Sequence, residues 1–178
     1  MDKAYELANV EKLAKDVIFQ MEVLTRYILP AASSKAGKPV YQLTMIVDLA
    51  GSSIYQFNNY RPFLVAMQAI LVPNYPEILH KLYMINAPFI FTSIWYVAQT
   101  LLDPKTLEKV SILGEDYMSE LEKELDTDML PVSMQGECEC VEWGGCSKLR
   151  KGCWNDGSAP GFPKPEWESR IERKLLKK

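Results

Sequence analysis

The sequence of 178 residues lacks three features that mark common classes of protein. It has no uninterrupted apolar run of the roughly 18 residues that a membrane-spanning helix needs. It has no basic excess, because 20 lysines and arginines stand against 23 aspartates and glutamates, which argues against general nucleic-acid binding. Segment 1–15 carries charges where a signal peptide has its apolar centre. We therefore expect a cytoplasmic protein with reduced cysteines and no nucleic-acid partner.

Groups that commonly carry catalysis are also scarce. The chain has a single histidine, His80, and no glycine-rich loop of the kind that cradles phosphates. A serine–histidine–aspartate arrangement would depend on that one histidine. No nucleophile-elbow glycine pattern accompanies it, so a surface or helix-end role is the favoured interpretation. We therefore expect neither an enzyme nor a bound cofactor.

The four cysteines all lie in the last quarter of the chain, which is rich in glycine, proline and tryptophan and ends in a basic stretch. Four thiolates can hold zinc tetrahedrally, but this spacing lacks the paired Cys-x-x-Cys knuckles. Small buried residues in a compact loop are the favoured reading, with zinc and a disulfide as alternatives. The basic end suits either a solvated helix or an anionic membrane surface. No metal site is expected at Cys138, Cys140, Cys146 and Cys153.

The apolar pattern predicts helices that alternate with short strands. A repeat of three and four residues predicts an amphipathic helix from about residue 5 to residue 29, ended by Pro30. Later helices are expected at 57–72, 89–102, from Pro104 and at 116–126, the last with Tyr117, Leu121 and Leu125 directed inward. Mostly apolar strands are expected at 40–49, 81–87 and 110–113. This order favours an α/β domain with parallel strands and right-handed crossovers.

The segment from Tyr75 to Tyr117 holds the best candidates for binding. Its helix at 89–102 is apolar almost all round, which fits either core packing or the lining of an apolar ligand cavity. Thr106 and Lys109 share one face of a helical turn and offer a hydroxyl and a cation to a phosphate oxygen. Glu77 can accept hydroxyls of a headgroup or pair with a lysine. Ordinary surface polarity is the alternative for all three.

Several segments, taken in order, resemble the CRAL-TRIO lipid-binding domain, in the branch of the Sec-fourteen-type phosphatidylinositol/phosphatidylcholine transfer proteins. They are RYILPAASSKAG at 26–37, MIVDLAG at 45–51, NYPEILHKLYMINAPFIF at 74–91 and LLDPKTLEKVSILGEDY at 101–117. CECVEWGGCSKLRKGCWND at 138–156 is similar to the tail of some members. The likeness covers roughly residues 5 to 156.

This resemblance implies an α/β lobe with a largely parallel or mixed sheet and flanking helices that enclose an apolar lipid pocket. Residues 1–135 would form the lobe, without the family's N-terminal helical bundle and first strand, and 136–178 a tail with a basic C-terminal helix. The implied ligand is a phospholipid, foremost phosphatidylinositol, carried between membranes by a peripheral protein, with Golgi and endosomal membranes as candidates. The alternative is a module that senses lipid or binds another hydrophobic ligand without transfer.

The resemblance also implies site residues. Glu77, Thr106 and Lys109 would hold the headgroup, with Lys109 on the phosphate. Apolar residues at Met21, Leu43 and Met45 replace polar groups of the family's choline-lipid site, which argues against phosphatidylcholine bound in the family's mode. Ile78 replaces a basic residue that often follows the glutamate. A mobile gate over the pocket would consist of Phe91, Ile94, Trp95, Val97, Ala98 and Leu101.

Overall fold

The computed structural model describes residues 10–89, 91, 95–96, 99–102, 104–139 and 158–160. The chain divides into two compact units, which are described separately. The sheet unit comprises residues 1–17 and 42–149, and the helical unit comprises residues 18–41 and 150–178.

One helical path runs from α2 (Val10–Val23) through a π-helical turn (Leu24–Ile28) into α3 (Leu29–Ala36). The prediction that Pro30 ends this helix is therefore wrong. The N–H of Leu29 bonds to the carbonyl of Leu24 five residues back, and Pro30 follows in the first turn of α3, where its missing N–H is tolerated. The helix ends at Gly37, whose φ of 65° is the left-handed conformation common at helix C-termini.

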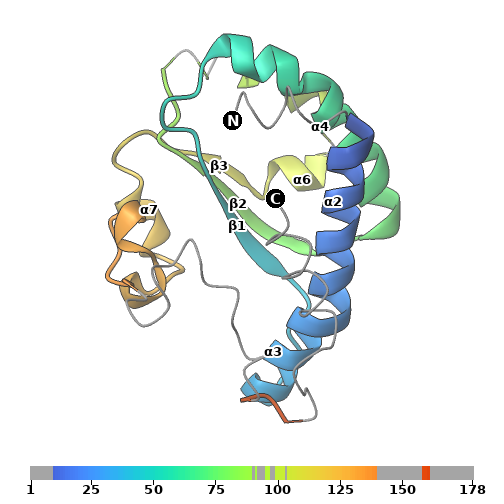
Figure 1. The fold of residues 1–178 in the computed structure, drawn as a ribbon. Helices are drawn as coiled ribbons and strands as arrows, with labels where there is room; N and C mark the ends of the chain where they lie inside the picture. Colours follow the sequence, from blue (N-terminus) through green and yellow to red (C-terminus); the bar gives the residue numbers. More distant parts are fainter. Residues whose placement is uncertain are drawn as a thin grey trace, which may run out of the picture. The chain divides into compact units, whose positions relative to one another are not determined.

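The sheet unit is built on three parallel strands, in the order β1, β2, β3 (Figure 1). They are β1 (Leu43–Asp48), β2 (Leu79–Ile85) and β3 (Val110–Ile112). The predicted strands are thus confirmed to within a few residues, as is the α/β class with a parallel sheet. The connection from β1 to β2 contains α4 (Ile54–Asn74), and the one from β2 to β3 contains η2 (Gln99–Leu101) and α6 (Pro104–Leu107).

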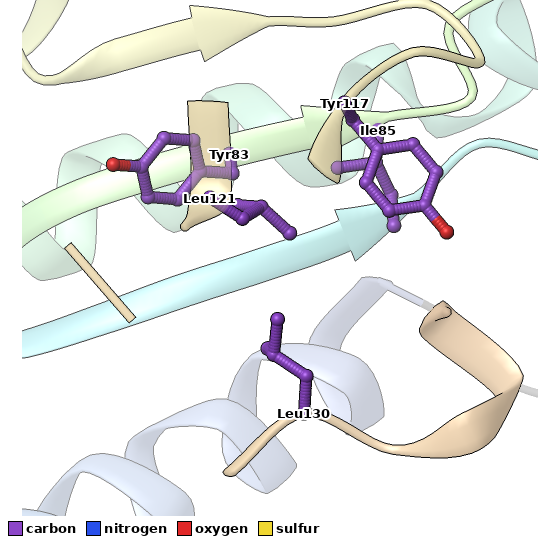
Figure 2. Close-up of a cluster of buried hydrophobic side chains, with 5 residues drawn as sticks. All are labelled: Tyr83, Ile85, Tyr117, Leu121 and Leu130. Carbon is purple, nitrogen blue, oxygen red and sulfur yellow. The ribbon is translucent and has the colours of Figure 1, made fainter. Parts of the chain in front are cut away.

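After β3 the chain folds back over one face of the sheet. It forms α7 (Met118–Leu121) and two 3-10 turns, η3 (Thr127–Met129) and η4 (Val132–Met134). Figure 2 shows the resulting core, in which two side chains of β2 meet three from the returning segment. These five residues are at most 4% exposed: Tyr83, Ile85, Tyr117, Leu121 and Leu130. The predicted inward positions of Tyr117 and Leu121 are confirmed, but the helix expected over 116–126 is wrong in length, because α7 spans only Met118–Leu121.

The opposite face of the sheet is also apolar. Side chains alternate between the two faces of a strand, so the neighbours of Tyr83 and Ile85 point the other way. The strand register aligns them in two rows, Met45–Leu82–Val110 and Val47–Met84–Ile112. Met45 is 42% exposed and the other five are partly exposed, and none belongs to the buried core. We call these six residues the open face.

No helix within the described part of the chain is both long enough and apolar enough to cross a bilayer.

Candidate functional site

Two of the three predicted site residues form an ion pair. The Nζ of Lys109 lies 3.0 Å from the Oε2 of Glu77, although the residues are 32 positions apart in the chain. The lysine side chain is 24% exposed and the glutamate 64% exposed. A pair this accessible to water stabilises a fold by about 0–1 kcal/mol, so fold stability is a weak reason for its presence.

The backbone of Lys109 is held from both sides. Its N–H donates to the carbonyl of Thr106 at 3.1 Å, which closes the turn after α6. Its carbonyl accepts the N–H of Leu82, on β2, at 2.8 Å. Thr106, the third predicted residue, is partly buried within α6, one turn before the lysine. The lysine therefore sits at a defined point, directly before the first residue of β3.

The ion pair lies at the edge of the sheet where all three strands begin. Glu77 stands two residues before β2, and Lys109 one residue before β3. The neighbours of the pair, Leu82 and Val110, share one row of the open face. The backbone of Lys109 thus adjoins a row of apolar side chains, at the end of the sheet where the ion pair lies. This combination suits an amphiphile whose phosphate would meet the ammonium while its hydroxyls donate to the carboxylate.

Gln42 is a neighbour of this site that sequence reasoning missed. Its Nε2 donates to the main-chain carbonyl of Glu77 at 3.1 Å, across 35 positions of the chain. Nothing in the local pattern around Gln42 signals such a contact, because the two residues meet only when β1 and β2 pair. Glu77 itself has a φ of 57°, in the left-handed region that residues other than glycine seldom occupy.

The predicted gate is only partly within the described residues. Residues 91 and 95–96 are helical, and η2 follows at Gln99–Leu101. Phe91 is buried at 6% exposure and Trp95 is partly buried, whereas the next side chain, Tyr96, is 73% exposed. Ile94, Val97 and Ala98, and the side chain of Leu101, lie outside the described residues.

The residues expected to disfavour a choline lipid fall in different places. Met45 belongs to the open face and is 42% exposed. Leu43 begins β1, pairs with Leu79 and is partly buried, as is Ile78. Met21 is buried in α2, at 9% exposure.

The single histidine belongs to a separate polar cluster. The Nε2 of His80 and the Nζ of Lys81 each lie 3.6 Å from a carboxylate oxygen of Glu124, in the segment that follows α7. The pKa of the Tyr83 hydroxyl is raised to about 12. Burial of the hydroxyl is the larger cause, and its hydrogen bond to Glu124 is the second. The cluster thus links β2 to the returning segment. Among the described residues, no group of three or more histidine, cysteine or acidic side chains is arranged to hold a metal ion.

Comparison with known proteins adds independent information. The family model of the CRAL/TRIO domain matches residues 3–136. The chain is 40% identical over 155 residues to the phosphatidylinositol/phosphatidylcholine transfer protein SFH9 of Arabidopsis thaliana, a match that covers 86% of this chain and 27% of that protein. It is 31% identical over 156 residues to the Sec14 cytosolic factor of Schizosaccharomyces pombe, covering 88% of this chain and 54% of that factor.

A solved structure supports the fold. The crystal structure of Sfh5 matches 98% of this chain and 54% of its own, with a TM-score of 0.56 and 19% sequence identity. The chain therefore spans about half, or less, of the length of these relatives.

Proposed function

The chain belongs to the CRAL/TRIO domain family, and we propose that it binds a phospholipid and carries it between membranes. The acyl chains would lie along the open face, and the headgroup would lie at Glu77 and Lys109. The names of the two relatives, a phosphatidylinositol/phosphatidylcholine transfer protein and a Sec14 cytosolic factor, support this class of ligand. Because the relatives are longer than this chain, the proposal concerns the part of their activity that this lobe performs.

One observation carries the proposal: the backbone of Lys109, one partner of the ion pair, directly adjoins an apolar row. The carbonyl of Lys109 bonds to the N–H of Leu82, and the next residue, Val110, lies beside Leu82 on the open face. A phospholipid needs this adjacency, since its charged phosphate is joined to apolar chains by only a few bonds. Each CH₂ moved out of water contributes about 0.8 kcal/mol, so the apolar rows supply affinity and the charged edge supplies orientation.

We propose phosphatidylinositol as the preferred ligand. Its headgroup offers a phosphate to Lys109 and ring hydroxyls to Glu77, with Thr106 one turn away as a further partner of the phosphate. A choline headgroup has no hydroxyl to donate to Glu77. In addition, Met45 puts a thioether on the open face where a choline-lipid site would need a polar group.

We propose that the helix around Phe91 and Trp95 covers the acyl chains and opens at a membrane. The exposed ring of Tyr96 suits the headgroup region of a bilayer, where aromatic rings with one polar end are favoured. We assign residues 1–135 to the lipid-binding lobe and 136–178 to a tail, a division that agrees with the end of the family match at residue 136.

A lipid-sensing module without transfer activity is the second candidate. The apolar residues Met21, Leu43 and Met45 motivate it, because they replace polar groups of the family's choline-lipid site. The two candidates differ in what the purified protein retains and in what it does with vesicles. Solvent extraction followed by mass spectrometry should find phospholipid, and labelled phosphatidylinositol should move from donor to acceptor vesicles. Absence of both results would refute the transfer proposal, and a retained sterol or other hydrophobic molecule would favour the second candidate.

Lys109→Ala tests the headgroup site. A charge-assisted hydrogen bond contributes about 1.5–3 kcal/mol, so the substitution should weaken phosphatidylinositol binding about tenfold or more. Lys105→Ala is the matched control, because Lys105 is an exposed lysine on α6, the short helix that ends two residues before Lys109. Equal effects of the two variants would show that general positive charge, and not the position of Lys109, attracts the lipid.

A further inference from the structure

Gln42 stands at a structural junction of the site. It directly precedes β1, and its carboxamide donates to the main-chain carbonyl of Glu77 at 3.1 Å. The next residue, Leu43, donates its N–H to the carbonyl of Ile78 at 2.9 Å. Gln42 and Leu43, at the start of β1, thus hold two successive carbonyls of the corner that leads into β2.

This corner has an irregular backbone. Glu77 has a φ of 57°, a conformation that costs a residue with a side chain about 1–3 kcal/mol and persists where its surroundings enforce it. The strand pairing is also irregular, because Leu43 pairs with Leu79 and Thr44 with Lys81, so that His80 is an extra residue. Bulges of this kind redirect neighbouring side chains and are frequent beside binding sites.

The two partners of the ion pair are secured differently. Lys109 is held by main-chain bonds on both sides, to Thr106 and to Leu82. On the Glu77 side, the side chain of Gln42 donates to the carbonyl of Glu77, and the N–H of Leu43 donates to the next carbonyl, that of Ile78. Loss of the carboxamide would therefore act on the glutamate and leave the backbone of the lysine in place.

We infer that Gln42 is a positioning residue: it holds the left-handed backbone of Glu77 and thereby aims the carboxylate at Lys109. The inference rests on the proposed headgroup site and deepens it. A carboxylate fixed 3.0 Å from the ammonium presents acceptors for hydroxyls directly beside the phosphate-binding cation. Gln42 would then favour headgroups with hydroxyls over headgroups without them, although it makes no contact with the lipid itself.

Gln42→Met removes the donor and keeps the length of the side chain. We expect the affinity for short-chain phosphatidylinositol to fall about three- to tenfold, the effect of one neutral hydrogen bond, with little change for short-chain phosphatidylcholine. In a Glu77→Gln background the same substitution should have no further effect, because no carboxylate is left to aim. Gln20→Met, at an exposed position of α2, is the matched control.

A readout without ligand accompanies these measurements. In labelled protein, the nuclear Overhauser contact between the side chains of Glu77 and Lys109 should be present in the wild type and in Gln20→Met, and lost in Gln42→Met. The inference is overturned if that contact survives in Gln42→Met. It is also overturned if the loss of affinity persists in the Glu77→Gln background, or if both lipids lose affinity equally together with a lower melting temperature. A wild type that binds neither lipid refutes the proposed function itself, whatever the contact shows.

Discussion

The two faces of the sheet differ both in composition and in burial. By alternation, Thr44, Lys81 and Ser111 lie on the face of Tyr83 and Ile85, whereas the six residues of the open face are all apolar. On one face, Tyr83 and Ile85 are at most 1% exposed, beneath Tyr117, Leu121 and Leu130. On the open face, all six apolar side chains retain exposed area, and Met45 retains 42%. Adjacent residues of one strand, such as Met84 and Ile85, thus lie in different surroundings.

This difference separates residues that stabilise the fold from residues available to a ligand. Burial of apolar area contributes about 25 cal/mol per Å², and on the covered face this free energy stabilises the fold. On the open face part of the apolar area stays exposed to water, and a bound acyl chain would bury it. The covered face therefore stabilises the fold, and the open face is available to bind a ligand.

The strongest test of the comparison replaces two neighbouring residues of β2, one at a time, by alanine. Ile85→Ala removes a fully buried side chain and should lower the free energy of unfolding by about 2–5 kcal/mol. Met84→Ala, on the open face, should lower it by only about 1 kcal/mol in lipid-free protein. Urea denaturation of the two variants measures both values. Similar losses would mean that the two faces are equally covered, and the assignment would be wrong.

A second test concerns the loop that holds Leu130 on the covered face. The N–H of Gly136 donates to Pro131 at 3.0 Å, and Cys138 donates to the carbonyl of Leu130 at 2.9 Å. A Cβ built on Gly136 would overlap the backbone carbonyl of Leu130. Gly136→Ala should therefore cost about 1–3 kcal/mol of stability, the usual cost of overpacking.

Gly114→Ala provides the control for this glycine, since a Cβ at Gly114 meets no atom within 4 Å. Thermal denaturation should show a lowered midpoint for the Gly136 variant and little change for the Gly114 variant. An unchanged midpoint for Gly136→Ala would mean that the loop adapts without displacing Leu130.

The smallest predicted effect depends on pH. Because the folded state raises the pKa of Tyr83 from 10.0 to about 12, it favours the neutral hydroxyl. This contribution to stability is fully present below pH 10 and is lost as the pH rises through 12. The free energy of unfolding of the wild type should therefore exceed that of Tyr83→Phe by about 1 kcal/mol below pH 10. Above pH 10 this difference should shrink.

Urea denaturation between pH 8 and pH 12 measures this difference. Tyr41→Phe, at a residue that is 66% exposed, is the matched control for loss of a tyrosine hydroxyl outside the covered face. If wild type and Tyr83→Phe lose stability in parallel above pH 10, the hydroxyl of Tyr83 does not couple the covered face to pH.

Much of the fold was predictable, and the failures have a local cause. The strands were found from short apolar runs, and the inward side of the segment after β3 was found from the spacing of Tyr117 and Leu121. The prediction that Pro30 ends the helix failed because proline does not always end a helix, and Pro62 also lies inside α4. A π-helical turn precedes Pro30, and the residues of the turn give no evident sign of it.

The candidate site was predictable only in part. Glu77, Thr106 and Lys109 were named from the family resemblance, and residue spacing linked only the last two. Strand pairing brings Glu77 to Lys109 and Gln42 to Glu77, although these residues are 32 and 35 positions apart in the chain. Such contacts have no local signature.

The sequence by itself determined that this chain forms parallel strands with connecting helices, because apolar runs and their lengths depend on neighbouring residues. It also determined which residue types are available: one histidine, few catalytic groups, and mostly apolar side chains along each strand. Only the tertiary structure decided which face is covered, because Leu130 and the other residues that cover it reach the sheet from a later part of the chain. It also decided that a cation and a carboxylate meet at the amino-terminal edge of the sheet, because strand register brings distant residues together.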